Sequence, residues 1–81
     1  MLRHIKIFSH DNQTTEEIIK LLNTVSIESG DELKVETIED RDEIHSYCIE
    51  RTPSIMLGCS IIHEGSIPTK EQILEWLSLE N

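Results

Sequence analysis

The chain has 81 residues, of which 37% are hydrophobic and 4% aromatic, so it can form one small domain with a modest, mainly aliphatic core. Its 16 acidic and 7 basic side chains give a formal net charge of -9, and no basic patch suited to nucleic acid or an anionic membrane is visible. No apolar run has the length of a signal peptide or of the roughly 18 residues that span a membrane, so we expect a cytoplasmic protein.

The first half of the chain alternates strand and helix patterns. Residues 4–8 begin with alternating polar and apolar side chains and are rich in β-branched ones, which predicts a strand. Thr14 and Glu17 have the spacing of a capping box, so we expect a helix from Thr14 that ends at Gly30. Residues 33–38 predict a second strand, and a strand-helix-strand series implies parallel pairing. Apolar residues at helical spacing mark the buried face of the helix: Ile18, Leu21, Leu22 and Val25.

A short helix and a Thr-Pro step follow. Residues 42–49 predict the helix, and Cys48 is expected among its core-facing side chains. The residue before a proline is pushed away from helical backbone angles, so the chain must become extended at Thr52. An X-Pro bond is also the ordinary place for a cis peptide, here Thr52–Pro53. Residues 54–57 then form a short apolar strand.

The last third predicts a hairpin and a helix. Gly58 supplies the positive φ of a tight turn, so residues 60–63 return antiparallel until Gly65 ends the strand. Thr69 and Gln72 form a second capping box at the start of the last helix. The buried side of that helix is expected to comprise Ile73, Leu74, Trp76, Leu77 and Leu79.

The order β-α-β-α-β-β-α, with Thr52–Pro53 opening an apolar strand and Gly65 after the next one, resembles the thioredoxin superfamily in its smallest, glutaredoxin-like or archaeal-thioredoxin-like form. The resemblance covers nearly the whole chain. It implies an α/β fold with a four-stranded mixed sheet and helices on both faces, as a single domain over residues 1–81. It also places Thr52–Pro53 where that family keeps its active-site cis-proline.

The chemistry of that family requires a Cys-x-x-Cys, or one cysteine, at the start of the first helix, where the helix N-terminus lowers the pKa of the thiol. Here the motif would fall at residues 13–16, Gln-Thr-Thr-Glu, and no cysteine is present. Disulfide exchange proceeds by attack of sulfur, so the usual dithiol oxidoreductase activity is not expected. Glutaredoxins also hold glutathione with a Gly-Gly and acidic residues after the fourth strand. Only Gly65 is present here, so we expect no cofactor.

Other chemistry is also unsupported by the sequence. The six positions from Pro53 to Cys59 span about 20 Å in a strand, whereas a disulfide needs Cα atoms within roughly 7 Å. We therefore expect no bond between Cys48 and Cys59, and Cys59 should be exposed. The histidines lack the spacing of metal ligands, so no metal is expected; they are His4, His10, His45 and His63.

The leading hypothesis is a non-catalytic, redox-inactive binding or adaptor domain with a protein or peptide partner. An extended peptide can add as a strand beside the proline, and a helix N-terminus can accept an anion. The chain itself would be a monomer or a weak homodimer. The face could instead be an inert remnant that only shapes the fold. The expected binding face comprises Ser9, His10, Asp11, Asn12, Gln13, Thr14, Arg51, Thr52 and Pro53.

Two alternatives stay open. One is a divergent thiol-redox protein that uses Cys48 or Cys59 singly. The other is an assembly module similar to the clock protein KaiB, which resembles thioredoxin, lacks the cysteine pair and enters a strand at a Thr-Pro. That resemblance is confined to residues 51–55 and the element order, because the proline-rich segment of KaiB has no counterpart at residues 58–60.

Overall fold

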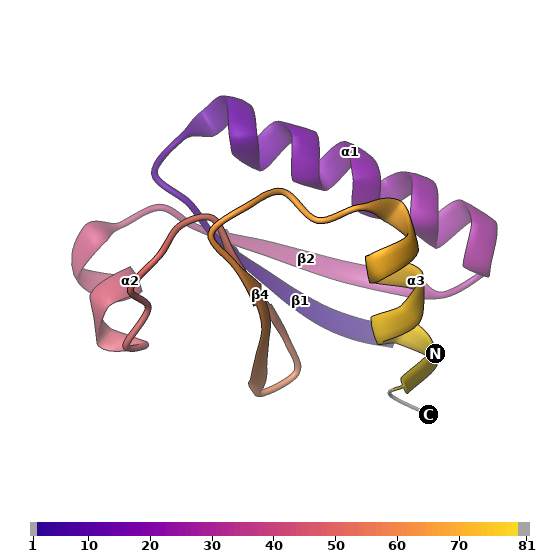
Figure 1. Cartoon of the computed structure of the whole chain (residues 1–81). Coiled ribbons are helices and arrows are strands. Elements are labelled where there is room, and N and C mark those ends of the chain that lie inside the picture. Colours follow the sequence, from indigo (N-terminus) through magenta and orange to yellow (C-terminus); the bar gives the residue numbers. More distant parts are fainter. Residues whose placement is uncertain (1, 80–81) are drawn as a thin grey trace.

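The computed structural model describes residues 2–79 and has the expected order of elements (Figure 1). The side chain of Leu79, expected on the buried side of the last helix, lies outside the described part. No helix in residues 2–79 combines the length and the apolar character needed to cross a membrane. The elements are β1 (Leu2–Phe8), α1 (Asn12–Ser29), β2 (Glu32–Ile38), α2 (Arg41–Ser46), β3 (Ser54–Leu57), β4 (Ser60–Glu64) and α3 (Lys70–Leu79).

The strands form one mixed sheet in the order β2-β1-β3-β4, which confirms the predicted sheet. β1 pairs with β2 in parallel and with β3 antiparallel, so Ile5 lies between Val35 and Leu57. β3 and β4 form an antiparallel hairpin whose register shifts between Ile55 and Met56. The two central strands, β1 and β3, therefore supply all the buried hydrophobic residues of the sheet except Ile38, and β2 and β4 are the edges.

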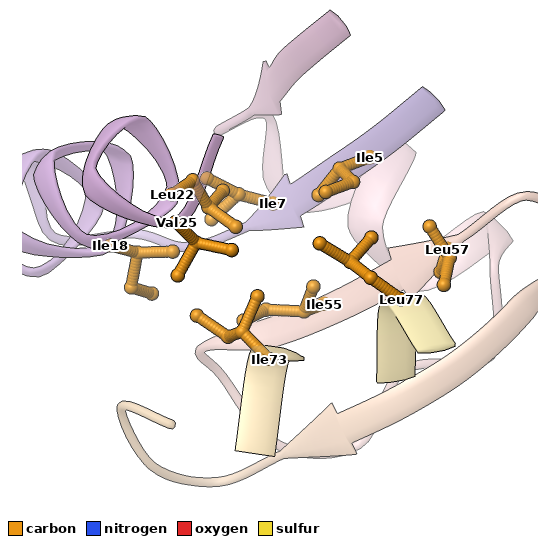
Figure 2. Close-up of a cluster of buried hydrophobic side chains, with 9 residues drawn as sticks. All are labelled: Ile5, Ile7, Ile18, Leu22, Val25, Ile55, Leu57, Ile73 and Leu77. Carbon is orange, nitrogen blue, oxygen red and sulfur yellow. The ribbon is translucent and has the colours of Figure 1, made fainter. Parts of the chain in front are cut away.

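Successive strand residues point to opposite faces, and this alternation divides the core into two clusters. The larger cluster lies between the sheet and the helices α1 and α3, and Figure 2 shows its side chains converging from β1, β3 and both helices. Full burial of an aliphatic side chain contributes about 1.5–3 kcal/mol, so this cluster is the main source of stability. Its members are Ile5, Ile7, Ile18, Leu22, Val25, Ile55, Leu57, Ile73 and Leu77.

The smaller cluster lies on the opposite face, under α2. Phe8 follows Ile7 in β1 and points the other way, and its ring contacts that of Tyr47 with centroids 4.9 Å apart. Helices therefore cover both faces, as predicted. Figure 1 shows α1 along one face and α2 at the end of the sheet where β1 stops. The members of this cluster are Phe8, Ile38, Ile44, Ile49 and Met56.

The predicted start of the first helix is wrong. α1 begins at Asn12, and its N-cap is Asp11, whose Oδ1 accepts a hydrogen bond from Gln13 N at 3.3 Å. Thr14 does not cap the helix; its hydroxyl donates to Asp11 Oδ2 at 2.7 Å. An aspartate is as good an N-cap as threonine, and here it acts three residues earlier. The end of the helix is as predicted, because Gly30 caps it with φ +78°.

The predicted burial of Cys48 is also wrong. α2 ends at Ser46, earlier than expected, and Cys48 N closes the following turn on His45 O at 2.9 Å. Cys48 has φ +60° and is exposed, and Ile49 enters the core instead. The helix is followed directly by a turn at Tyr47 and Cys48, and a bend at residues 51–53 then leads into β3.

The capping box predicted for the last helix is confirmed. Thr69 N donates to Gln72 Oε1 at 2.9 Å, and Gln72 N donates to Thr69 Oγ1 at 3.2 Å. Two backbone donors at the start of α3 are thereby satisfied reciprocally. The helix then places Ile73 and Leu77 one turn apart on the larger cluster.

Candidate functional site

The sheet brings the two predicted site segments together. Phe8 at the end of β1 pairs with Ser54 at the start of β3, so the residues just after Phe8 and just before Ser54 lie at the same end of the sheet. The Thr52–Pro53 peptide bond at this end is cis. The loop from β1 to α1 and the segment entering β3 therefore border one face (Figure 1). We call this surface, formed by residues 9–14 and 51–53, the cis-proline face.

Ser9 belongs to the framework beneath this face. Its side chain is buried, its N–H donates to Ile38 O at 3.2 Å, and its hydroxyl bonds the backbone N–H and C=O of Asp11, both at 3.2 Å. These bonds fix the loop that leads into α1. Of the other predicted residues in this segment, Thr14 is half-buried, and four are exposed: His10, Asp11, Asn12 and Gln13.

The carboxylate of Asp11 occupies the N-terminus of α1. Hydrogen bonds from the Thr14 hydroxyl and then from the Gln13 N–H hold the pKa of Asp11 below its ordinary value of 3.8. A negative charge is favourable next to the positive end of a helix dipole. The position that an external anion would need is thus taken by the chain's own carboxylate.

The first turn of α1 contains no thiol. Because the helix starts at Asn12, its first four residues are Asn12 to Thr15, one position earlier than the segment 13–16 expected from the sequence. Neither segment includes a cysteine. Thr15, which the sequence did not single out, is buried, and its hydroxyl donates to Asp11 O at 3.0 Å. A threonine four residues after the cap residue was the only signal for this contact.

On the other side of the face, only some of the backbone N–H and C=O groups around Thr52 form hydrogen bonds. The Ser54 hydroxyl donates to Arg51 O, and Gly65 N donates to Pro53 O at 2.8 Å. Between these two carbonyls, the half-buried Thr52 has no backbone hydrogen bond to another described residue. Its N–H and C=O therefore have no backbone partner among residues 2–79.

Arg51 and Gly65 form the border of this backbone. Gly65 has φ +88°, and a Cβ atom added there would lie 3.4 Å from Arg51 Cδ. The exposed side chain of Arg51 thus runs over Gly65 with its Cβ and Cδ atoms. Sequence reasoning placed Gly65 only at the end of a strand and missed this contact.

The two cysteines lie far from each other, and both are exposed free thiols, as expected for Cys59. Cys59 is in the turn between β3 and β4. Cys48 lines an open hollow of about 510 Å³ together with His45, Ile49 and Glu50. Within residues 2–79, no group of three or more His, Cys, Asp or Glu side chains could hold a metal ion.

The fold agrees with the comparison against known families. A family model described as a thioredoxin domain matches residues 3–78, which is nearly the whole chain. No curated protein matches the sequence. Because the family model covers nearly the whole chain, the chain belongs to the thioredoxin domain family.

Proposed function

We propose that this thioredoxin domain is a non-catalytic binding domain that takes an extended peptide segment of a partner protein at the cis-proline face. The observation that carries the proposal is the backbone of Thr52, which has no backbone hydrogen bond to another residue of the described range 2–79 and lies between two carbonyls that already accept hydrogen bonds. An extended peptide that pairs with exposed backbone gains main-chain hydrogen bonds without any particular side-chain chemistry. No sulfur is needed for such binding.

The charges at the face favour a peptide over a free anion. The carboxylate of Asp11 fills the helix N-terminus, so the anion binding expected from the sequence is not part of the proposal. Arg51 precedes Thr52 in the chain and its side chain is exposed, and a guanidinium has five donors in a planar fork that suits a carboxylate. The proposed ligand is therefore an extended peptide with an acidic side chain near its centre.

A matched pair of arginine variants tests this proposal. Random twelve-residue peptides displayed on phage are selected against the immobilised protein, and the enriched peptide is titrated into Arg51→Ala and Arg41→Ala. Both arginines are exposed and both variants lose one positive charge, but Arg41 lies on α2 and Arg51 on the face. We expect a dissociation constant raised about tenfold or more in Arg51→Ala only, since a hydrogen bond to a charged group contributes about 1.5–3 kcal/mol. Equal effects of the two substitutions, or no enriched peptide, would contradict the proposal.

A second candidate function, thiol chemistry at Cys48, is favoured by one observation. Contrary to expectation, Cys48 is exposed, and it borders the same hollow as the imidazole of His45. An exposed thiol is accessible to an external disulfide, and disulfide exchange proceeds by attack of a sulfur on that disulfide. An insulin-reduction assay with dithiothreitol as the reductant decides between the candidates. Turnover that disappears in Cys48→Ser but persists in Cys59→Ser would support the second candidate, and turnover no faster than dithiothreitol alone would exclude it.

A further inference from the structure

The two edges of the sheet differ in regularity. β2 runs for seven residues in one-to-one register with β1, and no described strand pairs with its outer side. β4, at the other edge, has a register shift opposite Ile55 and Met56. A bulge of this kind twists an edge and discourages further pairing, whereas a straight edge presents its backbone to another strand. β2 is thus the edge at which the sheet can be extended.

The charges on β2 are self-complementary. Glu32, Lys34 and Glu36 alternate along one face of the strand and are exposed. In an antiparallel pair of two β2 strands centred on Val35, Lys34 lies directly opposite Glu36 of the second copy, and Glu36 lies opposite its Lys34. Side chains directly opposite each other on one face of a sheet interact, and opposite charges there are stabilising. Lysine on an edge usually deters pairing, but in this register each lysine faces a glutamate.

The same pattern excludes the neighbouring registers. Centring the pair on Lys34 would bring the two lysines together, and centring it on Glu36 would bring the two glutamates together; like charges directly opposite are destabilising. A shift by one residue between the strands would also move the charges to the face of the apolar side chains. Centring the pair on Leu33 would also place Glu32 opposite Lys34, but it would pair only residues 32–34 of the strand, whereas centring it on Val35 pairs all seven residues. Charge and strand length together therefore select the register centred on Val35.

The apolar side of β2 fits the same pairing. Leu33 and Val35 are half-buried and pack on the larger core cluster from the edge of the sheet. In the register centred on Val35, the two valines meet, and each Leu33 meets Thr37 of the second copy. The pairing would cover apolar surface that a single chain leaves half exposed.

We propose that two copies of this chain associate through antiparallel β2 strands centred on Val35 and form one continuous eight-stranded sheet. The interface is isologous, so every contact occurs twice. It lies on a different edge from the cis-proline face and does not depend on the proposed peptide binding. Each chain carries a charge of -9, so the association is measured near 0.15 M salt, where the Debye length of about 8 Å screens repulsion between the rest of the two surfaces.

Charge reversal tests the register. Sedimentation equilibrium compares wild type with K34E, with E36K, with the double variant K34E/E36K and with an equimolar mixture of the two single variants. We expect each single variant alone to dimerise at least about tenfold more weakly, because it places two pairs of like charges in the interface. The double variant and the mixture should regain dimerisation near the wild-type level, because both restore opposite charges at every pair.

Two exposed positions on α1 provide controls with the same changes in net charge: K20E for K34E, and E17K for E36K. Both controls should dimerise as wild type does. Glu36 lies in register with Lys6 of β1, so E36K places two lysines side by side, and far-UV circular dichroism checks that this variant is folded. Dimerisation in the mixture then shows that β2 of each single variant can still pair with another strand. A wild type that stays monomeric up to about 1 mM, a K34E variant that dimerises as well as K20E, or a mixture that does not associate would overturn the proposal.

Discussion

Ile18 and Ile27 allow the same substitution to be compared at two positions of one helix. Both residues lie in α1, but Ile18 is 0% exposed in the larger core cluster and Ile27 is 83% exposed. Replacing a buried isoleucine by alanine costs about 2–5 kcal/mol, and alanine returns about 0.4 kcal/mol through its higher helix propensity. We therefore expect Ile18→Ala to lower the free energy of unfolding by about 2–4 kcal/mol and Ile27→Ala to leave it unchanged or slightly higher.

This loss is large for a chain of this size. Typical stabilities of about 0.05–0.15 kcal/mol per residue give roughly 4–12 kcal/mol for the whole domain, and each kcal/mol shifts the melting temperature of so small a domain by about 4–8 °C. Urea unfolding is followed by far-UV circular dichroism and by the fluorescence of Trp76, which packs on the same cluster. Coincident transitions establish two-state behaviour. Equal midpoints for Ile18→Ala and Ile27→Ala, or a cost below about 1 kcal/mol for Ile18→Ala, would refute the described packing of α1.

Three further predictions concern hydrogen bonds that the structure resolves. The pKa of Asp11 lies below 3.8 in the folded chain, so the ionised cap stabilises the fold above pH 3.8. This stabilisation is lost as the pH falls through the lowered pKa. Asp11→Asn removes the titrating group and should therefore flatten the decrease of the urea midpoint over this acidic range. The pKa of Lys6 is raised first by its hydrogen bond with the Tyr47 hydroxyl, 3.1 Å away, so Tyr47→Phe should bring it back toward 10.5, as measured by NMR of the lysine Cε; an unchanged pKa would contradict this contact. Thr69→Ala removes the bond that caps Gln72 N and should cost about 1 kcal/mol in thermal unfolding, whereas the exposed Thr24→Ala should cost little.

The order and type of the elements followed from the sequence because they depend on local signals. Alternation of polar and apolar residues predicted the strands, and apolar residues at helical spacing predicted the burial of Ile18, Leu22 and Val25. The reciprocal hydrogen bonds of Thr69 and Gln72 match the predicted capping box. These signals act over a few residues and do not require knowledge of the rest of the chain.

The errors arose where two local signals competed or where a distant contact decided. Asp11 and Thr14 are both good cap residues, and only the buried Ser9, which bonds the backbone of Asp11, fixes the loop that selects the earlier one. Cys48 matched the apolar side of a longer helix, but α2 ends earlier, in a turn whose hydrogen bonds the spacing of apolar residues does not encode.

The candidate site could be located from the sequence only in outline. The Thr-Pro step and the order of elements indicated which two segments meet, because the ends of β1 and β3 are adjacent in this topology. The inward orientation of Ser9, the lack of a backbone partner for Thr52 among residues 2–79 and the course of Arg51 over Gly65 depend on tertiary contacts between segments distant in the chain.

The most direct test of the proposed binding face is an NMR titration of the ¹⁵N-labelled protein with the selected twelve-residue peptide. We predict that the largest amide shift changes fall on Thr52, on Gly65 and on residues 10–14, with Thr52 N–H also protected from hydrogen exchange by the bound strand. The face would be excluded as the binding site if the peptide bound with its largest shifts on β2 or around the hollow at Cys48 while the amide of Thr52 stayed unchanged.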